Sequence, residues 1–153
     1  MTTFDPDAFL NTHVEGQMET KFTPLQEGDY GDAYIDKIEA AEMGGGAEKS
    51  KVLIVTFAVM DQRAKDQMGM EKPTLKHNIF LDFEEDGRLS FGKNKNVALG
   101  ALREAVNQNG PEPWSFRRLE GAGPVVLKIT HRFNKETGEG PYANVARVTK
   151  QAR

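Results

Sequence analysis

The run Lys51–Met60, KVLIVTFAVM, constrains the fold more than any other stretch of this chain. Apolar or β-branched residues occupy both parities of the run: Val52, Ile54 and Thr56 on one, and Leu53, Val55, Phe57 and Val59 on the other. Such a run is typical of a strand that is buried on both faces. A strand of this kind belongs in a sandwich or a closed barrel, so the run predicts the central strand of a mainly β domain.

The length and composition narrow the class of protein. A chain of 153 residues favours one domain with a single core. It contains no cysteine, which excludes disulfides, thiolate metal sites and a cysteine nucleophile. No apolar run approaches the roughly 20 residues of a membrane span, and the first residues lack the basic and apolar blocks of a signal peptide. We therefore expect a cytoplasmic protein with no membrane association.

Charge is distributed unevenly along the chain. Residues 1–62 carry 4 Lys and Arg against 12 Asp and Glu, whereas residues 63–153 carry 16 against 11. Binding follows the local field of a groove rather than the total charge, so a basic face on an acidic protein is physically allowed. The formal net charge of −3 is therefore compatible with an anionic partner.

The amino-terminal part predicts an arm that precedes the folded domain. Asp5–Leu10 (DPDAFL) has an N-cap residue, a proline at the first helical position and an acid in the first turn, which together predict a short helix. Gly16 and the polar residues after it break any pattern. We expect residues 1–24 to form a loosely docked arm, residues 25–150 to form the domain, and residues 151–153 to form a short basic tail.

Three strands are expected in the first half of the domain. Tyr30–Ala40 predicts the first, and Ile38 is out of step with Ile35 along it, which is typical of a bulge. The glycine-rich loop Met43–Ala47 leads into the central strand. A polar connection at Asp61–Lys72 then leads into a third strand at Thr74–Phe83.

The third strand places an aromatic residue among polar neighbours on its outward face. The outward parity holds Lys76, Asn78, Phe80 and Asp82, and the inward parity holds Leu75, His77, Ile79, Leu81 and Phe83. His77, on the inward parity, is interpreted as a core histidine.

A turn and a helix follow the third strand. Glu84–Arg88 predicts a hairpin turn through its Asp-Gly pair, and the chain returns through Leu89 and Phe91. A helix is expected to begin at a cap residue, Asn94 or Asn96, and to run to about Asn109. Its predicted apolar stripe comprises Ala98, Leu102, Ala105 and Val106.

The order of these elements predicts an OB-fold. Pro124–Phe133 and Pro141–Thr149 form two last strands, which gives three strands, a helix and two strands. An OB-fold is a five-stranded Greek-key barrel, here with a helix between its third and fourth strands. It commonly binds oligonucleotides on strands 2 and 3 and on two loops. Those loops correspond to Ala41–Ser50 and Phe133–Gly140.

Five stretches spaced along nearly the whole chain carry a family resemblance: Asp5–Leu10, Phe22–Tyr30, Gly100–Val106, Leu119–Gly121 and Tyr142–Val145. In these stretches the chain resembles small phage and prophage OB-fold proteins regarded as single-stranded DNA-binding proteins. The resemblance implies a protein that coats single strands during phage DNA replication or recombination, with proteins of that machinery as further partners. Many such coating proteins end in an acidic tail that recruits partners, whereas this sequence ends Lys150-Gln151-Ala152-Arg153.

Single-stranded nucleic acid is held by basic groups along its phosphates and by aromatic faces on which its bases stack. The candidates around the first loop and the neighbouring strands are Tyr34, Lys49, Lys51, Lys76 and Phe80. Those around the last loop are Arg132, Phe133, Lys135, Tyr142 and Arg147. For each aromatic the alternative is ordinary packing, which is the preferred interpretation for Trp114.

Lys93 and Lys95 form a separate candidate phosphate contact. Lysines at a helix N-terminus oppose the helix dipole and are tolerated best where an anion binds. The alternative is that both are ordinary solvated surface lysines.

A catalytic role finds little support in the sequence. Asp82, Glu84, Glu85 and Asp86 could hold Mg²⁺ for a nuclease, but they lie in one hairpin that its Asp-Gly turn explains. His13, His77 and His131 lack metal-ligand spacing, and Gly44–Gly46 lacks the lysine and hydroxyl of a P-loop. We expect no enzyme, no cofactor and no metal. The alternative to DNA binding is a β-barrel interaction or virion protein whose Tyr34 and Phe80 face meets protein. A homo-oligomer is compatible with either role.

Overall fold

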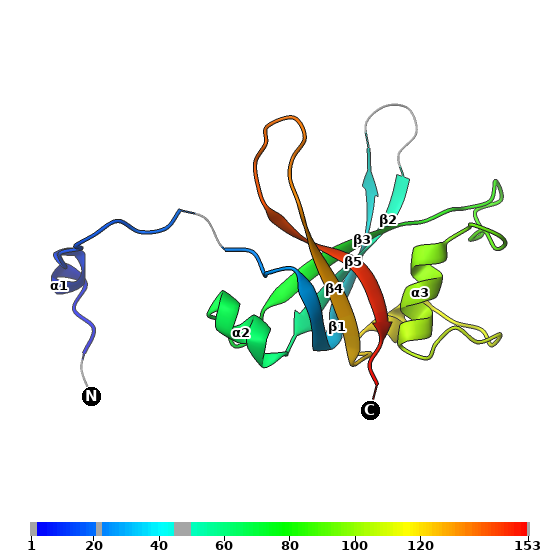
Figure 1. Cartoon of the computed structure of the whole chain (residues 1–153), viewed down its shortest axis with the longest axis horizontal. Coiled ribbons are helices and arrows are strands. Elements are labelled where there is room, and N and C mark those ends of the chain that lie inside the picture. Colours follow the sequence, from blue (N-terminus) through cyan, green and yellow to red (C-terminus); the bar gives the residue numbers. More distant parts are fainter. Residues whose placement is uncertain (1–2, 21–22, 45–49, 153) are drawn as a thin grey trace.

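The computed structural model describes residues 3–20, 23–44 and 50–152. Its body is a curled antiparallel sheet with short helices at its ends (Figure 1). The strands are β1 (Gly28–Met43), β2 (Ser50–Val59), β3 (Thr74–Phe80), β4 (Val125–Arg132) and β5 (Tyr142–Lys150). The helices are α1 (Pro6–Leu10), α2 (Gln62–Met68), α3 (Val97–Ala105) and the 3-10 helix η1 (Phe116–Leu119).

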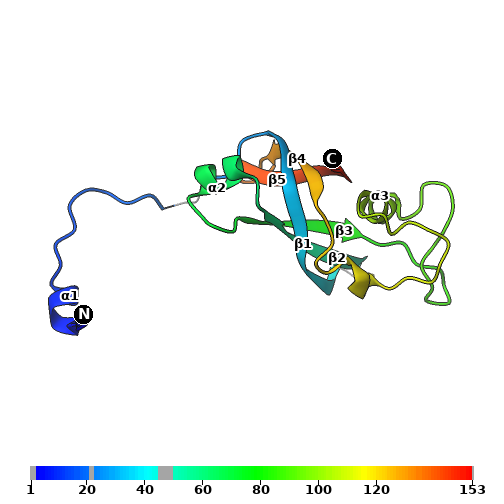
Figure 2. The same ribbon diagram turned by 90° about the horizontal axis from the view of Figure 1, so that it is seen from below.

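The five strands form one sheet in the order β3-β2-β1-β4-β5, and each adjacent pair is antiparallel. The long strand β1 pairs with β2 along its second half and with β4 near its start. The sheet curls so far that the two end strands, β3 and β5, come within 8 Å of each other by their Cα atoms (Figures 1 and 2). The predicted mainly β class with five strands is confirmed, and its form resembles a β-barrel.

Strand β2 is buried on both faces, as its sequence predicts. Leu53, Val55, Phe57 and Val59 point into the core. On the opposite face the short side chains of Val52, Thr56 and Ala58 are also buried. Lys37 and Lys76 flank Thr56 in the register of β1, β2 and β3. At Thr56, the outer face of β2 therefore carries a short side chain between two longer ones, from β1 and β3.

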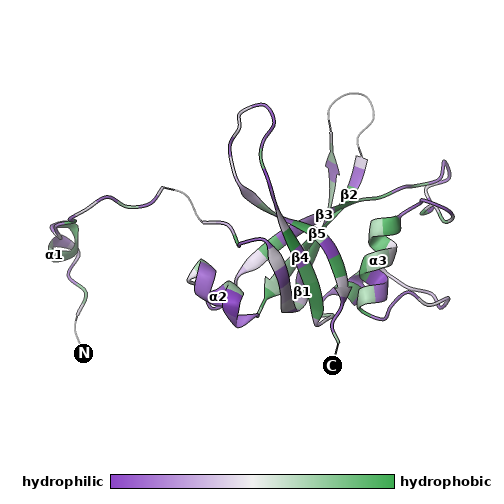
Figure 3. Ribbon diagram, viewed as in Figure 1, coloured by the Kyte–Doolittle hydropathy of each residue, from purple (hydrophilic) through white to green (hydrophobic). Residues whose placement is uncertain are grey.

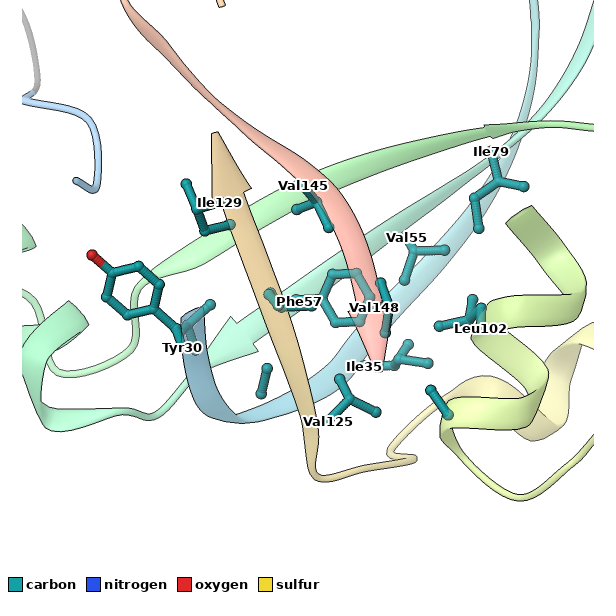
Figure 4. Close-up of a cluster of buried hydrophobic side chains, with 14 of the residues drawn as sticks. Tyr30, Ile35, Val55, Phe57, Ile79, Leu102, Val125, Ile129, Val145 and Val148 are labelled. Atoms are coloured by element: carbon teal, nitrogen blue, oxygen red, sulfur yellow. The ribbon is translucent and has the colours of Figure 1, made fainter. Parts of the chain in front are cut away.

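The core lies between the two halves of the curled sheet, with Phe57 near its centre (Figure 4). Inward residues of all five strands surround this ring, among them Ile35, Val55, Ile79, Ile129 and Val145. Helix α3 closes one end of the core through its buried residues Leu99, Leu102 and Ala105. The predicted stripe was wrong at Ala98, which is exposed, because the helix turns Leu99 inward instead.

The bulge predicted in the first strand is confirmed. The β1–β2 register shifts between Ile35 and Lys37, which restores Ile38 to the inner side after the break in alternation. The strand runs on to Met43, beyond its predicted end at Ala40.

Strand β3 ends at Phe80, three residues earlier than predicted. Beyond Phe80 the backbone is hydrogen-bonded to the side chain of Asn96. Asn96 Oδ1 accepts from the Asp82 N–H at 2.8 Å, and Asn96 Nδ2 donates to the carbonyls of Asp82 and Ser90. Asn96 stands at the N-cap position of α3, but its side chain makes no capping bond and holds this loop instead. Helix α3 itself ends at Ala105 rather than near Asn109.

Helix α2 lies in the segment predicted to be an irregular polar connection. Asp61 caps it by accepting from the Arg63 N–H at 3.0 Å, and Gly69 ends it in the left-handed region at φ 63°. Only Ala64 of this helix is buried, and Figure 3 shows α2 as largely hydrophilic. Without an apolar stripe, periodicity could not reveal it, although the Asp and Gly caps were readable.

Asp61 also fixes the helix to the sheet. Its side chain accepts from the Gly31 N–H at 3.1 Å and pairs with Arg63 at 3.0 Å. The hydrogen bond from Arg63 lowers the pKa of the Asp61 carboxyl below its usual value.

The helices do not provide a membrane span. Within residues 3–20, 23–44 and 50–152, none of them is both long and apolar enough to cross a bilayer.

The core and the surface of the sheet should respond differently to loss of an aromatic ring. Phe57→Ala is expected to lower the free energy of unfolding by about 3 to 5 kcal/mol, because it leaves a cavity at the centre of the core. Phe80→Ala truncates a ring that is 58% exposed and should change it by less than about 0.5 kcal/mol. Urea unfolding followed by circular dichroism measures both values. Similar losses in the two variants would contradict the assigned faces.

Candidate nucleic-acid interface

The outer sides of β1, β2 and β3 form one surface, which we call the front face. The strand registers align three rows across it: Tyr34–Ala58–Thr74, Lys37–Thr56–Lys76 and Ala41–Val52–Phe80. The predicted outward orientation of Lys76 and Phe80 is confirmed, and both side chains are exposed. Three of the predicted site residues, Tyr34, Lys76 and Phe80, therefore lie on one face.

The front face is long enough for several nucleotides. The rows of Tyr34 and Phe80 are six residues apart on β2, which corresponds to about 20 Å along the strand. Lys76 lies between them, two residues along β2 from the row of Tyr34. An extended polymer that crosses this face would meet an aromatic ring at each end and a cation between them.

Phe80 is the more accessible of the two front-face rings. Tyr34 is 38% exposed and its ring lies against Gly123, where an added Cβ would come within 3.0 Å of Tyr34 Cδ1. Phe133 lies against Gly140 in the same manner, because a Cβ added to Gly140 would come within 3.1 Å of Phe133 Cδ1. Both glycines have φ near +140°, where other residues are strained. Packing thus explains part of the placement of Tyr34, whereas the side chains of Phe80 and Phe133 are 58% and 60% exposed.

The outer sides of β4 and β5 form a second surface, which we call the side face. Arg132 lies directly opposite Tyr142, and Lys128 lies directly opposite Arg147. Between these pairs, Asn144 Nδ2 donates to Thr130 Oγ1 at 3.2 Å. The side face brings together four predicted or newly found basic and aromatic side chains, and it continues into the loop that carries Phe133 and Lys135.

Lys128 is a basic residue of the side face that is not among the candidate DNA contacts predicted from the sequence. Its outward parity in the fourth strand was readable, but its importance comes from the register that sets it against Arg147. Like charges directly opposite each other on a sheet destabilise the folded chain. On its other side Lys128 lies opposite Asp29 of β1, so an attraction stands beside this repulsion.

The front and side faces adjoin because β3 and β5 run side by side. A cavity near the start of β5 is lined by Leu75, Tyr142 and Ala143 and also by Glu19, Thr20 and Glu139. Part of the arm and two carboxylates therefore lie at this junction of the two faces.

Several basic residues of the two faces are unpaired, as are other described cations such as Lys65, Lys93 and Lys95, whereas Lys37 on the front face pairs with Glu39. Five cations form ion pairs: Lys37, Arg63, Lys72, Arg88 and Arg117. Within the part of the chain that the structure describes, Lys76, Lys128, Arg132, Lys135 and Arg147 have no carboxylate within 4.0 Å. These five charges remain available to an anion.

Lys51, which we predicted as a contact at the first loop, lies at the start of β2 and not on the front face. It shares the parity of Leu53, so its side chain lies on the inner side of β2, with Nζ 4.5 Å from the centre of the Phe83 ring. That parity could have been read from the sequence. Lys49, the other lysine predicted at this loop, lies outside the described residues.

Lys93 and Lys95 are exposed in the segment that joins β3 to α3. Figures 1 and 2 place this segment at the far end of the molecule, beyond α3 and away from the β4–β5 hairpin. The structure does not bring these two lysines together with the other candidates.

Trp114 is a packing residue, as preferred from the sequence. It is half-buried against the core, and its Nε1 donates to Gln108 Oε1 at 2.7 Å. The Arg103 guanidinium lies 4.3 Å from its ring centre and the Phe116 ring meets it edge-on. The Arg103 guanidinium therefore covers one face of the indole.

The acidic hairpin after β3 is explained by its own contacts. Asp82 accepts from the Asn96 N–H at 3.1 Å, and Asp86 pairs with Arg88 at 2.8 Å. The hydrogen bonds from Arg88 lower the pKa of Asp86 below its usual value. Across the described ranges, no three His, Asp or Glu side chains gather as a metal site.

Comparison of the sequence with protein-family models and with curated proteins finds no match.

His77 lies beneath the front face and should make folding sensitive to mild acid. Its ring is half-buried 6.4 Å from that of Phe57, and burial lowers the pKa of His77 below its usual 6.5. The unfolded chain therefore takes up this proton more readily than the folded one. Stability should be complete above about pH 6.5 and should fall as the pH drops from there toward the folded-state pKa.

The variant His77→Phe should lose this part of the pH dependence while keeping a ring in place. The measurement is the urea midpoint of parent and variant at about pH 7.5 and about pH 5.5, on either side of the unfolded-state pKa. The parent is expected to lose more stability over this interval than the variant. An equal loss in both would show that other groups cause it.

Proposed function

We propose that this chain is an OB-fold protein that binds single-stranded DNA without catalysis and with little sequence preference. The topology supports the fold: β1, β2 and β3 follow one another in the sheet, α3 lies between β3 and β4, and β4 and β5 pair on the other side of β1. The approach of β5 to β3 supports closure of the sheet into a Greek-key barrel. In such barrels strands 2 and 3 commonly carry the oligonucleotide.

The proposal rests chiefly on unpaired cations beside exposed aromatic rings on two adjoining faces. Phe80 and Lys76 are on the front face, and Tyr142 and Arg132 oppose each other on the side face. Base stacking on an aromatic ring contributes about 1 to 3 kcal/mol and tolerates any base, while the cations meet the phosphates. This combination favours single strands, because a duplex keeps its base faces covered.

The Lys128–Arg147 pair adds to the argument for an anionic partner. The two residues lie directly opposite each other on the side face, and a phosphate between them could pair with both cations.

The biological setting follows from the resemblance to phage and prophage coating proteins. We place the protein in phage DNA replication or recombination in the host cytoplasm, with single-stranded DNA as its main partner and proteins of that machinery as further ones. The alternative is a β-barrel interaction or virion structural protein in which the ring of Phe80 meets protein instead of bases.

Fluorescence anisotropy of a labelled oligo-dT, with duplex DNA alongside and across a salt series, tests the proposal. Tight binding to the single strand alone, falling linearly on a log–log plot of affinity against salt, is expected for phosphate contacts. A protein-interaction role predicts no binding even at low salt. That result would remove DNA binding from consideration.

Single substitutions on the front face should separate stacking from phosphate contact. Phe80→Ala is expected to weaken oligo-dT binding by about 5- to 150-fold at every salt concentration, because it removes one stacking surface. Lys76→Ala should lower the slope of the salt plot by about 0.7, the value for one phosphate contact on a single strand. Arg88→Ala is the charge-matched control, because Arg88 pairs with Asp86 in the distant hairpin. If both front-face variants bind like this control, the face is misassigned.

Loss of the Lys128 charge should affect binding more than stability. Lys128→Ala is expected to change the free energy of unfolding of the free protein by less than about 0.5 kcal/mol, because it removes the repulsion from Arg147 together with the attraction to Asp29. The same variant should bind oligo-dT more weakly and with a smaller salt slope. Urea unfolding and the anisotropy assay measure the two effects. A salt slope like that of the parent protein would remove Lys128 from the interface.

A further inference from the structure

The amino-terminal arm exposes apolar side chains that the protein body does not cover. Residues 3–20 are exposed throughout, and the apolar residues among them are Phe4, Phe9, Leu10, Val14 and Met18. Phe9 is 64% exposed and Leu10 is 77% exposed. Single exposed apolar residues are ordinary, but this arm concentrates them on one short segment, which is typical of an interaction site.

The arm has local structure that would suit it for docking. Asp5 caps α1 by accepting from the Asp7 and Ala8 N–H groups, and the rings of Phe4 and Phe9 pack on each other at 5.5 Å between centres. Figure 1 shows α1 far from the sheet at the end of an extended segment. A small helix with a preformed aromatic pair loses little conformational entropy when it binds.

A matching apolar pocket lies on the inner side of the β1–β2 hairpin, where the hairpin extends beyond the core. Its volume is about 520 Å³. Its apolar lining includes Ile38, Ala40, Leu53, Leu81, Phe83 and Phe116. The size falls in the range of pockets that hold a ligand or an anchoring side chain. Most of its lining from β1 and β2 belongs to the inner side of these strands, and Ala41 and Val52, which share a row with Phe80, line it as well.

We propose that the arm of one chain docks into this pocket on a second copy, with Phe4 and Phe9 as the anchoring rings. The segment between α1 and the body, residues 11–23, can extend roughly 40 Å. A body of this size has a diameter of roughly 35 Å. The arm is therefore long enough to leave its own body and reach the pocket of a neighbour.

Charge supports this pairing of arm and pocket. Residues 3–20 contain Asp5, Asp7, Glu15 and Glu19 but no Lys or Arg. Lys51 and Arg117 line the pocket, and Lys51 has no carboxylate within 4.0 Å among the described residues. The pocket also contains Glu39 and Glu42, of which Glu39 pairs with Lys37 at 3.3 Å. The acids next to Phe4 would meet the Lys51 ammonium, which otherwise lies over Phe83.

Arm exchange would link chains in a row. On a long single strand it would make neighbouring molecules bind cooperatively, and this consequence rests on the proposed function. The docking itself needs no DNA, so it can be tested in its absence.

Disulfide crosslinking provides the test, because the chain has no cysteine of its own. A full-length chain carrying Ala8→Cys, next to Phe9 in α1, is mixed with a differently tagged chain carrying Ala40→Cys in the pocket wall. The control partner carries Ala146→Cys, which is exposed in β5. Docking should give at least about tenfold more mixed dimer with the pocket cysteine than with the control, because it raises the local concentration of the two thiols. Adding Phe9→Ser to the arm should remove this excess.

Three results would overturn the proposal. The first is equal crosslinking to Ala40→Cys and Ala146→Cys. The second is an excess that survives Phe9→Ser. The third is a chain carrying both Ala8→Cys and Ala40→Cys that crosslinks within itself in dilute solution, because the arm would then fold back on its own body. None of these results depends on whether the protein binds oligo-dT, so the two proposals can fail separately.

Discussion

Burial of strand β2 on both faces is the constraint on which the rest of this structure depends. Its inward side chains, with Phe57 at the centre, need apolar partners from every other strand, and the sheet can supply them only by curling around that ring. The same curl brings β3 and β5 together, although they stand at opposite ends of the strand order. The core therefore decides which outer surfaces become neighbours.

The outer surfaces carry the side chains on which the DNA-binding proposal rests. On β2 the outward Val52, Thr56 and Ala58 are buried, whereas Lys76 and Phe80 of the neighbouring strand β3 are exposed. On β4 and β5 the register places Lys128 opposite Arg147. Exposed cations next to exposed rings are the physical basis of that proposal.

Two features remain outside both the core and these faces. The arm displays aromatic side chains that its own body does not bury, and the β1–β2 hairpin carries an apolar pocket lined mainly by the inner side of its strands. Docking between copies would cover the rings of the arm and fill the pocket. It would take place beside the Phe80 end of the front face, because Val52 of that row also lines the pocket.

The sequence by itself determined the strands, their faces and the bulge in β1, because a period of two in apolar residues directly reports which side of a strand is buried. It also placed Phe80 and Lys76 outward on one strand. Only the tertiary structure decided which strands are neighbours, and hence that Lys128 meets Arg147. Helix α2 escaped detection because only Ala64 faces the core, and α3 turned Leu99 inward rather than Ala98 because docking on the sheet sets its rotation. Pairing and rotation depend on contacts between residues far apart in the chain, which local periodicity does not encode.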